Sequence, residues 1–405
     1  MPTSCEEFKT KRIETEALYE KFVSVLKEVE ESDSPEARDR AEILLGALES
    51  KLMKLREEFI GYLSLFDVMS HPEHTMEHLE RLKHTNLWDE EKGLWASGID
   101  RSGHEVGSNC YIGDQFLYLR LLVALEKEDE VKAHLAKLKT SLWDEEKGLW
   151  VWGLDKGGQA GTDICYASNQ LSYLRLLIAM GKEEEAKALL EKLKQTDLWD
   201  TEKEWWVQSI NKTSGEKILN YHTSDQLSYL RLLIALGEKE EAEAHLTKLK
   251  QTDLWDKTEK LWIRYTQKDD NEGDIDCVTS DQLSYLCILA VLRKEDEAKA
   301  QLERLKQTNL WDERKELWIY STRKKPGAGD SRRYTYDQLL YLRLLVTLGE
   351  DYEARVWFEK LKQTKLWDAE KEMWIEGVRK DSDELHTFYY VSDQLLGALV
   401  EGLVE

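Results

Sequence analysis

A tryptophan-containing segment occurs six times in this chain at a nearly constant interval. In each copy a Leu-Trp-Asp tripeptide is followed, seven residues after its Trp, by a second Trp. The first Trp of the six copies stands at Trp88, Trp143, Trp199, Trp255, Trp311 and Trp367. The first interval is 55 residues and the other four are 56, and a fixed interval of this length indicates a repeat architecture. The chain is therefore expected to be built from six copies of one unit.

Each unit carries two different helical patterns. The stretch 183–194 has apolar residues on one stripe and charges on the other, which predicts an amphipathic outer helix. The stretch 225–237 is apolar around most of its circumference, which predicts a buried inner helix. Between them, the Asp after the first Trp begins a turn, and the alternation that follows predicts a short hairpin. Gly93 and Gly148 occupy this turn in the first two units, but Glu or Lys stands there later, so Gly is favourable and not required.

Six such units predict an all-α fold with twelve helices. Neither end of the repeat array carries an obviously polar unit of the kind that caps an open solenoid. We therefore expect residues 71–405 to close on themselves as an (α/α)6 toroid with six repeats. Residues 1–70 lack the repeat, and their helical periodicity on both sides of Pro35 predicts a separate N-terminal helical hairpin.

The order of elements, the six-fold count and the Trp-Asp-x-Glu-x-Gly turns at 88–93 and 143–148 resemble six-hairpin (α/α)6 proteins. These include N-acylglucosamine 2-epimerases and several glycosidase families. The resemblance implies a ligand pocket at the centre of one face, bounded by the hairpins and the N-terminal ends of the inner helices. Related toroids also host isoprenoid cyclases, protein prenyltransferase subunits and lanthionine cyclases, so the resemblance indicates a location for function and not its identity.

The composition restricts the partners of the chain. Its 80 acidic and 57 basic side chains give a net charge of -23, which disfavours binding to nucleic acid or anionic membranes. No long apolar run and no secretion signal are present, so a cytoplasmic location is expected. Five scattered cysteines without a CxxC pair fit reduced thiols. The charged fraction of 34% is a mild indication of a thermophilic source.

Comparison of the six units with one another separates scaffold from candidate site, because positions that are the same in every copy are most simply structural. The paired tryptophans are interpreted as core residues. The Asp-Gln pair that opens each inner helix, Asn-Gln in the second unit, is interpreted as a cap in which Gln reaches back to the helix start. Arginines inside the inner helices are expected to pair with carboxylates or carbonyls.

Two variable positions are predicted to line the pocket: the residue two places after the second Trp, and the residue three places before each Asp-Gln. Both are expected on one face of an extended segment. Aromatic side chains mixed with a few polar groups are typical of a sugar-binding site, and a solvated loop surface is the alternative. The predicted substrate-binding residues are Tyr111, Trp152, Tyr166, Gln208, Tyr320, Tyr334 and Tyr390.

His222, Arg264 and Glu376 are the predicted catalytic residues. His222 replaces a Tyr or Val of the other copies and is of a type that titrates near neutrality, although a structural role is the alternative. Glu376 suits acid or base chemistry, and Arg264 suits anion binding.

Two further groups are weaker candidates. The basic residues at 323–325 and 332–333 would suit a carboxylate or phosphate, or form a solvated loop. Cys165, His222 and Cys277 would suit zinc, but adjacent positions of an extended segment face opposite ways, and buried thiols are the default. We predict no metal and no cofactor.

Two classes of function remain open. The first is a carbohydrate-active enzyme, glycosidase-, epimerase- or isomerase-like, with a sugar in the central pocket. Epimerases of the resembled fold place histidines on inner helices, and the predicted inner helices of this chain contain no histidine. A glycosidase needs two opposed carboxyl groups. The second is a non-catalytic binding or scaffold protein that uses the toroid face or the N-terminal hairpin for a protein partner. An isoprenoid or lanthionine-type cyclase ranks third, because no Asp-rich diphosphate motif is present.

Overall fold

The computed structural model describes residues 72–104, 110–154, 163–218, 220–267, 276–323, 332–379 and 388–404, with a few residues between 17 and 48. The chain divides into two units, 1–63 and 64–405, and all six repeats lie in the second. Most of the predicted N-terminal hairpin lies outside the described residues, and the described stretches 23–27 and 41–48 are helical. No helix in the described part of the chain is long and apolar enough to cross a membrane.

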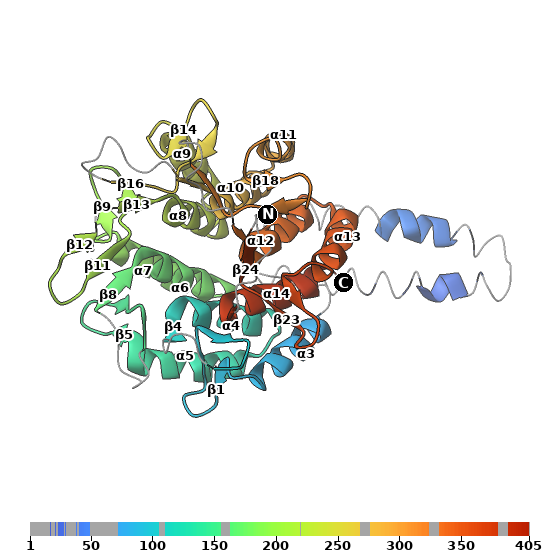
Figure 1. Cartoon of the computed structure of the whole chain (residues 1–405), viewed down its shortest axis with the longest axis horizontal. Helices are drawn as coiled ribbons and strands as arrows, with labels where there is room; N and C mark the ends of the chain where they lie inside the picture. Colours follow the sequence, from blue (N-terminus) through green and yellow to red (C-terminus); the bar gives the residue numbers. More distant parts are fainter. Residues whose placement is uncertain are drawn as a thin grey trace. The chain divides into compact units, whose positions relative to one another are not determined.

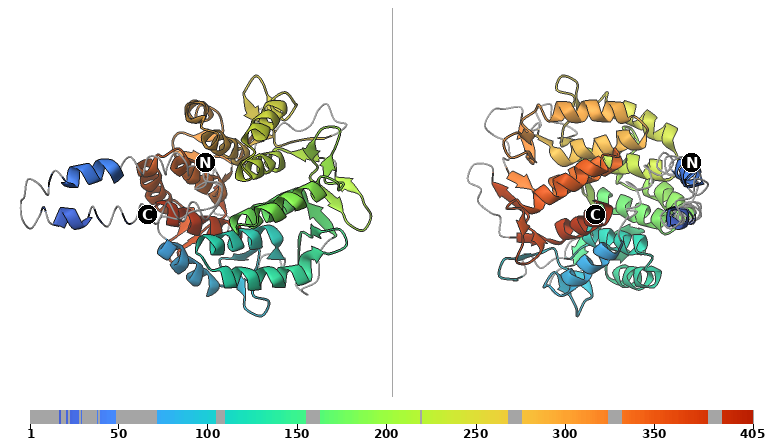
Figure 2. Two further views of the ribbon diagram at one scale, coloured as in Figure 1. Left: turned by 180° about the vertical axis from the view of Figure 1, so that it is seen from behind. Right: turned by 90° about the vertical axis from the view of Figure 1, so that its right-hand side faces the viewer.

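Two concentric layers of helices make up the repeat region, as Figures 1 and 2 show. The outer helices are α3 (Pro72–Lys83), α5 (Glu128–Leu142), α7 (Glu183–Leu193), α9 (Lys239–Leu249), α11 (Glu295–Leu305) and α13 (Asp351–Lys362). Helix α7, for example, buries only one stripe. The inner helices, buried on most sides, are α4 (Ile112–Ala124), α6 (Ala167–Ala179), α8 (Thr223–Ala235), α10 (Thr279–Val291), α12 (Thr335–Thr347) and α14 (Val391–Val404). Each unit therefore runs from an outer helix through its strands to an inner helix.

A two-stranded antiparallel hairpin lies between the helices of every unit, and its two tryptophans are cross-strand partners. The hairpins are β1 (Trp88–Asp89) with β2 (Leu94–Trp95), β5 (Trp143–Asp144) with β6 (Leu149–Trp150), β9 (Trp199–Asp200) with β10 (Trp205–Trp206), β14 (Trp255–Asp256) with β15 (Leu261–Trp262), β18 (Trp311–Asp312) with β19 (Leu317–Trp318), and β22 (Trp367–Asp368) with β23 (Met373–Trp374). The turn residue has a positive φ in all six, including Glu204, Lys260, Glu316 and Glu372, so glycine is not required there.

A second set of strands joins each unit to the next. The strand after each hairpin pairs with the strand that leads into the preceding inner helix. The pairs are β4 (Cys110–Tyr111) with β7 (Gly153–Leu154), β8 (Ile164–Tyr166) with β11 (Ser209–Asn211), β13 (Asn220–His222) with β16 (Tyr265–Gln267), β17 (Asp276–Val278) with β20 (Ser321–Arg323), β21 (Arg332–Tyr334) with β24 (Gly377–Arg379), and β25 (Phe388–Tyr390) with β3 (Gly98–Asp100). The short strand β12 (Lys217–Ile218) extends the β8 and β11 pair.

A buried glutamine fastens every hairpin to its inner helix, which corrects the capping interpretation. The Gln side chain accepts a hydrogen bond from the N–H of the second Trp at 2.9–3.2 Å and donates one to the carbonyl of the same Trp at 2.6–2.8 Å. The N-caps of α4, α6, α8, α10 and α12 make no side-chain cap bond. The predicted cap is therefore wrong, because a buried amide that satisfies two backbone groups of a hairpin is the better use of this residue.

The ring closes between its first and last elements. The pair of β25 with β3 has the same form as the other cross-unit pairs. Helix α14 packs against both α3 and α4, so the six inner helices contact one another in an unbroken circle. Closure leaves no terminal unit with an exposed apolar face, which explains why no polar capping repeat is needed.

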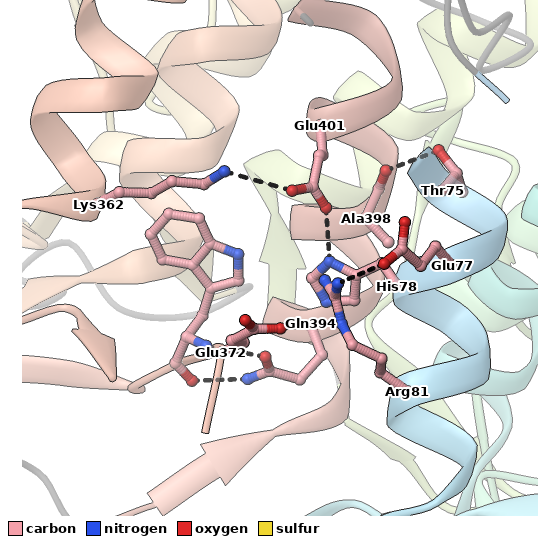
Figure 3. A network of polar contacts seen from close by, with 10 residues as sticks. Thr75, Glu77, His78, Arg81, Lys362, Glu372, Gln394, Ala398 and Glu401 are labelled. Atoms are coloured by element: carbon pink, nitrogen blue, oxygen red, sulfur yellow. Dashed lines mark hydrogen bonds and ion pairs between the residues drawn. The ribbon is translucent and has the colours of Figure 1, made fainter. Parts of the chain in front are cut away.

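A polar network around Glu401, which the other units lack, holds the closing seam (Figure 3). His78 of α3 lies 2.7 Å from a carboxylate oxygen of Glu401 on α14, and Lys362 of α13 lies 3.3 Å from the other oxygen. The Thr75 hydroxyl donates to the Ala398 carbonyl at 2.9 Å. In the other five inner helices the residue equivalent to Glu401 is a leucine. Burial alone would raise the pKa of Glu401, but the bond from His78 and the charge of Lys362 lower it.

Glu401→Gln should lower the free energy of unfolding at pH 7 by about 3 kcal/mol, because it breaks a buried charged contact. A lowered carboxyl pKa stabilises the fold above the ordinary value of 4.5 and ceases to do so as pH falls through the folded pKa. The loss should therefore shrink below pH 4.5 in denaturant titrations. The double variant His78→Leu/Glu401→Leu, which copies Leu189 and Leu177 of α7 and α6, should recover most of the stability at pH 7. An unchanged Glu401→Gln stability would contradict the role of the seam.

Candidate functional site

A cavity of about 610 Å³ opens at the N-terminal ends of α10, α12 and α14. Its size falls within the range of small-molecule sites. The described residues that line it come only from the fourth, fifth and sixth units, so the cavity lies to one side of the ring. They are Arg264, Asp276, Ser280, Tyr320, Ser321, Arg332, Tyr334, Tyr336, Asp337, Glu376, Tyr390, Ser392 and Asp393.

Backbone hydrogen bonds place the two variable positions beside each other at this end of the toroid. The Glu376 N–H donates to the Phe388 carbonyl at 2.9 Å, and the Glu376 carbonyl accepts from the first N–H of α12, that of Thr335, at 2.9 Å. Arg264 is held in the same way between Asp276 and Thr223. The side chains can therefore differ from unit to unit while their backbone positions stay the same.

The exposure of these positions follows strand alternation. All ten predicted site residues are partly exposed. The neighbouring column, one residue earlier in the chain, is buried throughout and consists of Cys110, Cys165, Tyr221, Cys277, Arg333 and Tyr389. Adjacent residues of an extended strand thus alternate between the partly exposed side and the core.

The cavity brings together five of the ten predicted site residues. Tyr320 and Tyr334 meet edge to face at 4.9 Å, and Tyr390 lies at the same cavity. Glu376 and Arg264 supply charged groups of opposite sign. The Arg332 guanidinium lies 5.0 Å from the centre of the Tyr334 ring, an added cation–π contact. One cavity therefore combines aromatic faces with a carboxyl group and two guanidinium groups.

The other five predicted residues lie outside that lining. Tyr111 stacks on Trp152 at 4.7 Å, and Trp152 contacts Tyr166 at 5.9 Å. These three rings form an aromatic cluster in the first two units. The Asn220 amide donates to Gln208 at 3.3 Å.

His222 stacks on Tyr265 with 5.3 Å between ring centres. Burial and the nearby charge of Arg264 lower the pKa of His222 to about 4. The imidazole is therefore neutral at pH 7 and is not a proton donor there.

The aspartates of the Asp-Gln pairs form a buried ring of carboxyl groups, which the sequence interpretation missed. They stand at the N-terminal ends of inner helices and follow one another around the axis as Asp114, Asp225, Asp281, Asp337 and Asp393, with Asn169 in the second unit. Burial raises the pKa of Asp114 and of Asp281 to about 7, and it raises the pKa of the other three well above the usual range. Each of these carboxyl groups therefore keeps its proton to a higher pH than an exposed aspartate does.

Two of these aspartates line the cavity. Asp337 is 1% exposed, and its Oδ2 atom has no hydrogen-bond partner. Burial raises the pKa of Asp393, and the charges of Glu376 and Asp337 raise it further. A buried polar atom without a partner and a set of interacting carboxyl groups are both typical of functional sites.

The two weaker candidates are described in part, because Lys324 and Lys325 lie outside the described residues. Arg333 is buried 2.5 Å from Asp312 and does not belong to a ligand loop, whereas Arg332 does face the cavity. Within the described ranges no three His, Cys, Asp or Glu side chains are grouped to hold a metal ion. Cys165 and Cys277 lie on the buried column, away from the face of His222.

Several solved structures are similar to this chain over nearly their whole length. A D-mannose isomerase matches with a TM-score of 0.64 at 14% identity over 83% of this chain and 98% of that one. A cellobiose 2-epimerase from Bacillus thermoamylovorans matches with 0.60 at 14% identity over 80% and 98%. A glycoside hydrolase family 76 mannosidase from Bacteroides thetaiotaomicron matches with 0.53 at 13% identity over 82% and 96%. No family model matches the chain, and no curated protein matches its sequence significantly.

The chain is a six-hairpin (α/α)6 toroid. The predicted fold class and the resemblance stated from the sequence are confirmed. At these identities the similarity establishes the fold alone, so the chemistry of the toroid must be argued from its own cavity.

Asp281→Asn should stabilise the toroid in a pH-dependent way. Because the folded pKa of about 7 lies above the ordinary 3.8, ionisation opposes folding, and the cost grows between these two pH values. Removing the charge should raise the free energy of unfolding at pH 8 by up to about 4 kcal/mol and change little at pH 4. Denaturant titrations at both pH values, with the exposed Asp253→Asn as control, measure this difference. Equal effects at the two pH values would contradict it.

Proposed function

We propose that the toroid is a carbohydrate-active enzyme that binds a sugar in the cavity beside α10, α12 and α14. The observation that carries the proposal is the meeting of four carboxyl groups with aromatic faces in one cavity, and these groups belong to Glu376, Asp337, Asp393 and Asp276. Sugar rings have apolar faces that pack on aromatic side chains and hydroxyl edges that need hydrogen-bond partners. A cavity with both kinds of group suits such a ligand.

Of the four tyrosines that line the cavity, Tyr320, Tyr334 and Tyr390 are assigned to sugar binding. Tyr320 and Tyr334 stand edge to face, so their rings present surfaces of different orientation. Arg264 and Arg332 donate hydrogen bonds but accept none, and they suit the oxygens of a hydroxylated ligand. The predicted binding roles of Tyr111, Trp152, Tyr166 and Gln208 remain proposals for a longer ligand that extends toward the first three units.

Asp393 and Glu376 are the proposed reacting pair. Burial and the neighbouring carboxyl groups raise the pKa of Asp393, so it keeps its proton to a higher pH than an ordinary aspartate and is assigned as the proton donor. It can give that proton to a glycosidic oxygen while the bond from this oxygen to the anomeric carbon breaks. Glu376 removes a proton from the water whose oxygen bonds to that carbon. Two carboxyl groups with different proton affinities are what glycoside hydrolysis requires.

Cleavage of a glycosidic bond is supported better than epimerisation. The lowered pKa of His222, about 4, makes it a weak base, and it stacks on Tyr265 outside the cavity lining. The inner helices contain no histidine. The similar structures include a D-mannose isomerase, a cellobiose 2-epimerase and a mannosidase. All three names refer to sugars, which supports the substrate class.

Glu376→Gln and Asp393→Asn should each lower kcat at least about 100-fold while the fold is retained, because each removes a proton-transfer group. Product release from a panel of glucosides, mannosides and oligosaccharides, followed by mass spectrometry, measures this. Activity should fall as pH rises through the raised pKa of Asp393, because the proton donor is then lost. The exposed Glu370→Gln is the matched control.

A sugar that binds the wild type without any turnover would contradict the enzyme and favour a non-catalytic binding protein. Failure of every sugar to bind would contradict the substrate class itself.

A further inference from the structure

One position at the axis breaks the symmetry of the inner helices. The residue before each Asp or Asn of the ring is small in five units and large in one. In chain order the six residues are Gly113, Ser168, Ser224, Ser280, Tyr336 and Ser392. Because positions that differ among otherwise equal units are the better site candidates, Tyr336 belongs to the site, although the sequence interpretation did not select it.

Tyr336 exposes its side chain to the cavity. It is 41% exposed, whereas its neighbours Thr335 and Asp337 are at most 1% exposed. Burial among protein atoms nevertheless raises the pKa of its hydroxyl. Tyr336 lines the cavity together with Ser280 and Ser392, the small equivalents on the two neighbouring inner helices. The ring therefore stands among small residues, where it limits the free space.

A layer of arginines lies deeper along the axis. Arg231 of α8 interacts electrostatically with Arg120 of α4 and with Arg343 of α12. These three helices alternate around the circle of six, so their side chains approach one another only near the axis. Each arginine follows its ring aspartate by six residues, which is about 9 Å along the helix.

Tyr336 lies at the cavity and also senses this layer. It interacts electrostatically with Arg231 and Arg343, and Cys287 interacts with the same two arginines. Tyr336 lines the cavity, whereas Arg231, Arg343 and Cys287 do not. The arginines follow the N-terminal ends of their helices by about two turns, so they lie beyond the end at which Tyr336 meets the cavity.

We propose that Tyr336 is the floor of the cavity and determines how long a sugar chain the toroid accepts. With this floor in place the ligand ends at Tyr336, so the site takes small sugars or the terminal residue of a chain. The inference rests on the proposed function for its ligand, but the floor itself can be tested without any sugar.

The first experiment measures the depth of the cavity by the reactivity of Cys287 toward iodoacetamide, followed by peptide mass spectrometry. Tyr336→Ser, which restores the residue of four other units, should speed labelling of Cys287 about tenfold or more. Tyr336→Phe keeps the ring and should leave the rate unchanged. Cys110, Cys165 and Cys277 are buried on the strands that join neighbouring units, and they act as internal controls. An unchanged Cys287 rate in Tyr336→Ser overturns the proposal.

The second experiment measures affinity for linear oligosaccharides of one to six units. Tyr336→Ser should gain about tenfold or more in affinity for the longer chains relative to the monosaccharide, whereas Tyr336→Phe should keep the wild-type preference. An identical length preference in Tyr336→Ser overturns the selection by length. If Cys287 becomes reactive but no sugar binds any variant, the floor is supported and the proposed function fails.

If labelling of Cys110, Cys165, Cys277 and Cys287 speeds up together in Tyr336→Ser, that variant has unfolded and a second variant is used. Ser280→Tyr adds a second ring to the cavity and must shift the preference toward shorter chains. No shift in that variant overturns the proposal.

Discussion

The hydrogen bonds between each buried glutamine amide and both backbone groups of a tryptophan are the interaction on which the rest of the toroid depends. All six glutamines are at most 1% exposed, and each satisfies a donor and an acceptor that would otherwise be buried without partners. This fixes each hairpin to the start of its inner helix. Since the contact reaches backbone on the hairpin side, the residues that follow the tryptophan can change without loosening the scaffold.

Closure of the ring concentrates polar groups at the axis. The same register that fixes the hairpins places an Asp at the N-terminal end of five inner helices, where four of the carboxyl groups are buried and that of Asp114 is partly exposed. Their raised pKa values mean that the folded state resists ionisation there. A scaffold that tolerates this cost at one end of its axis has the properties of a site selected for function at the expense of stability.

The site results from departures from six-fold symmetry. Arg264, Glu376 and Tyr336 each differ from their counterparts in the other units, and all three line the same cavity. Glu401, which replaces leucine, likewise distinguishes the closing seam from the five internal contacts. Equal units supply the frame, and single unequal residues distinguish the cavity and the closing seam.

The sequence by itself determined the repeat, the helix layers and the closed fold, because a constant interval and helical periodicity are local properties of the chain. Strand alternation also predicted that Tyr334 faces the ligand side, since the pattern has a period of two. The sequence did not show that Gln282 binds Trp262 instead of capping α10. Nor did it show that Arg333 pairs with Asp312 or that the aspartates meet in a ring. Only the tertiary structure decided these points, because they depend on which side chains from different helices converge at one axis and on how far that convergence excludes water.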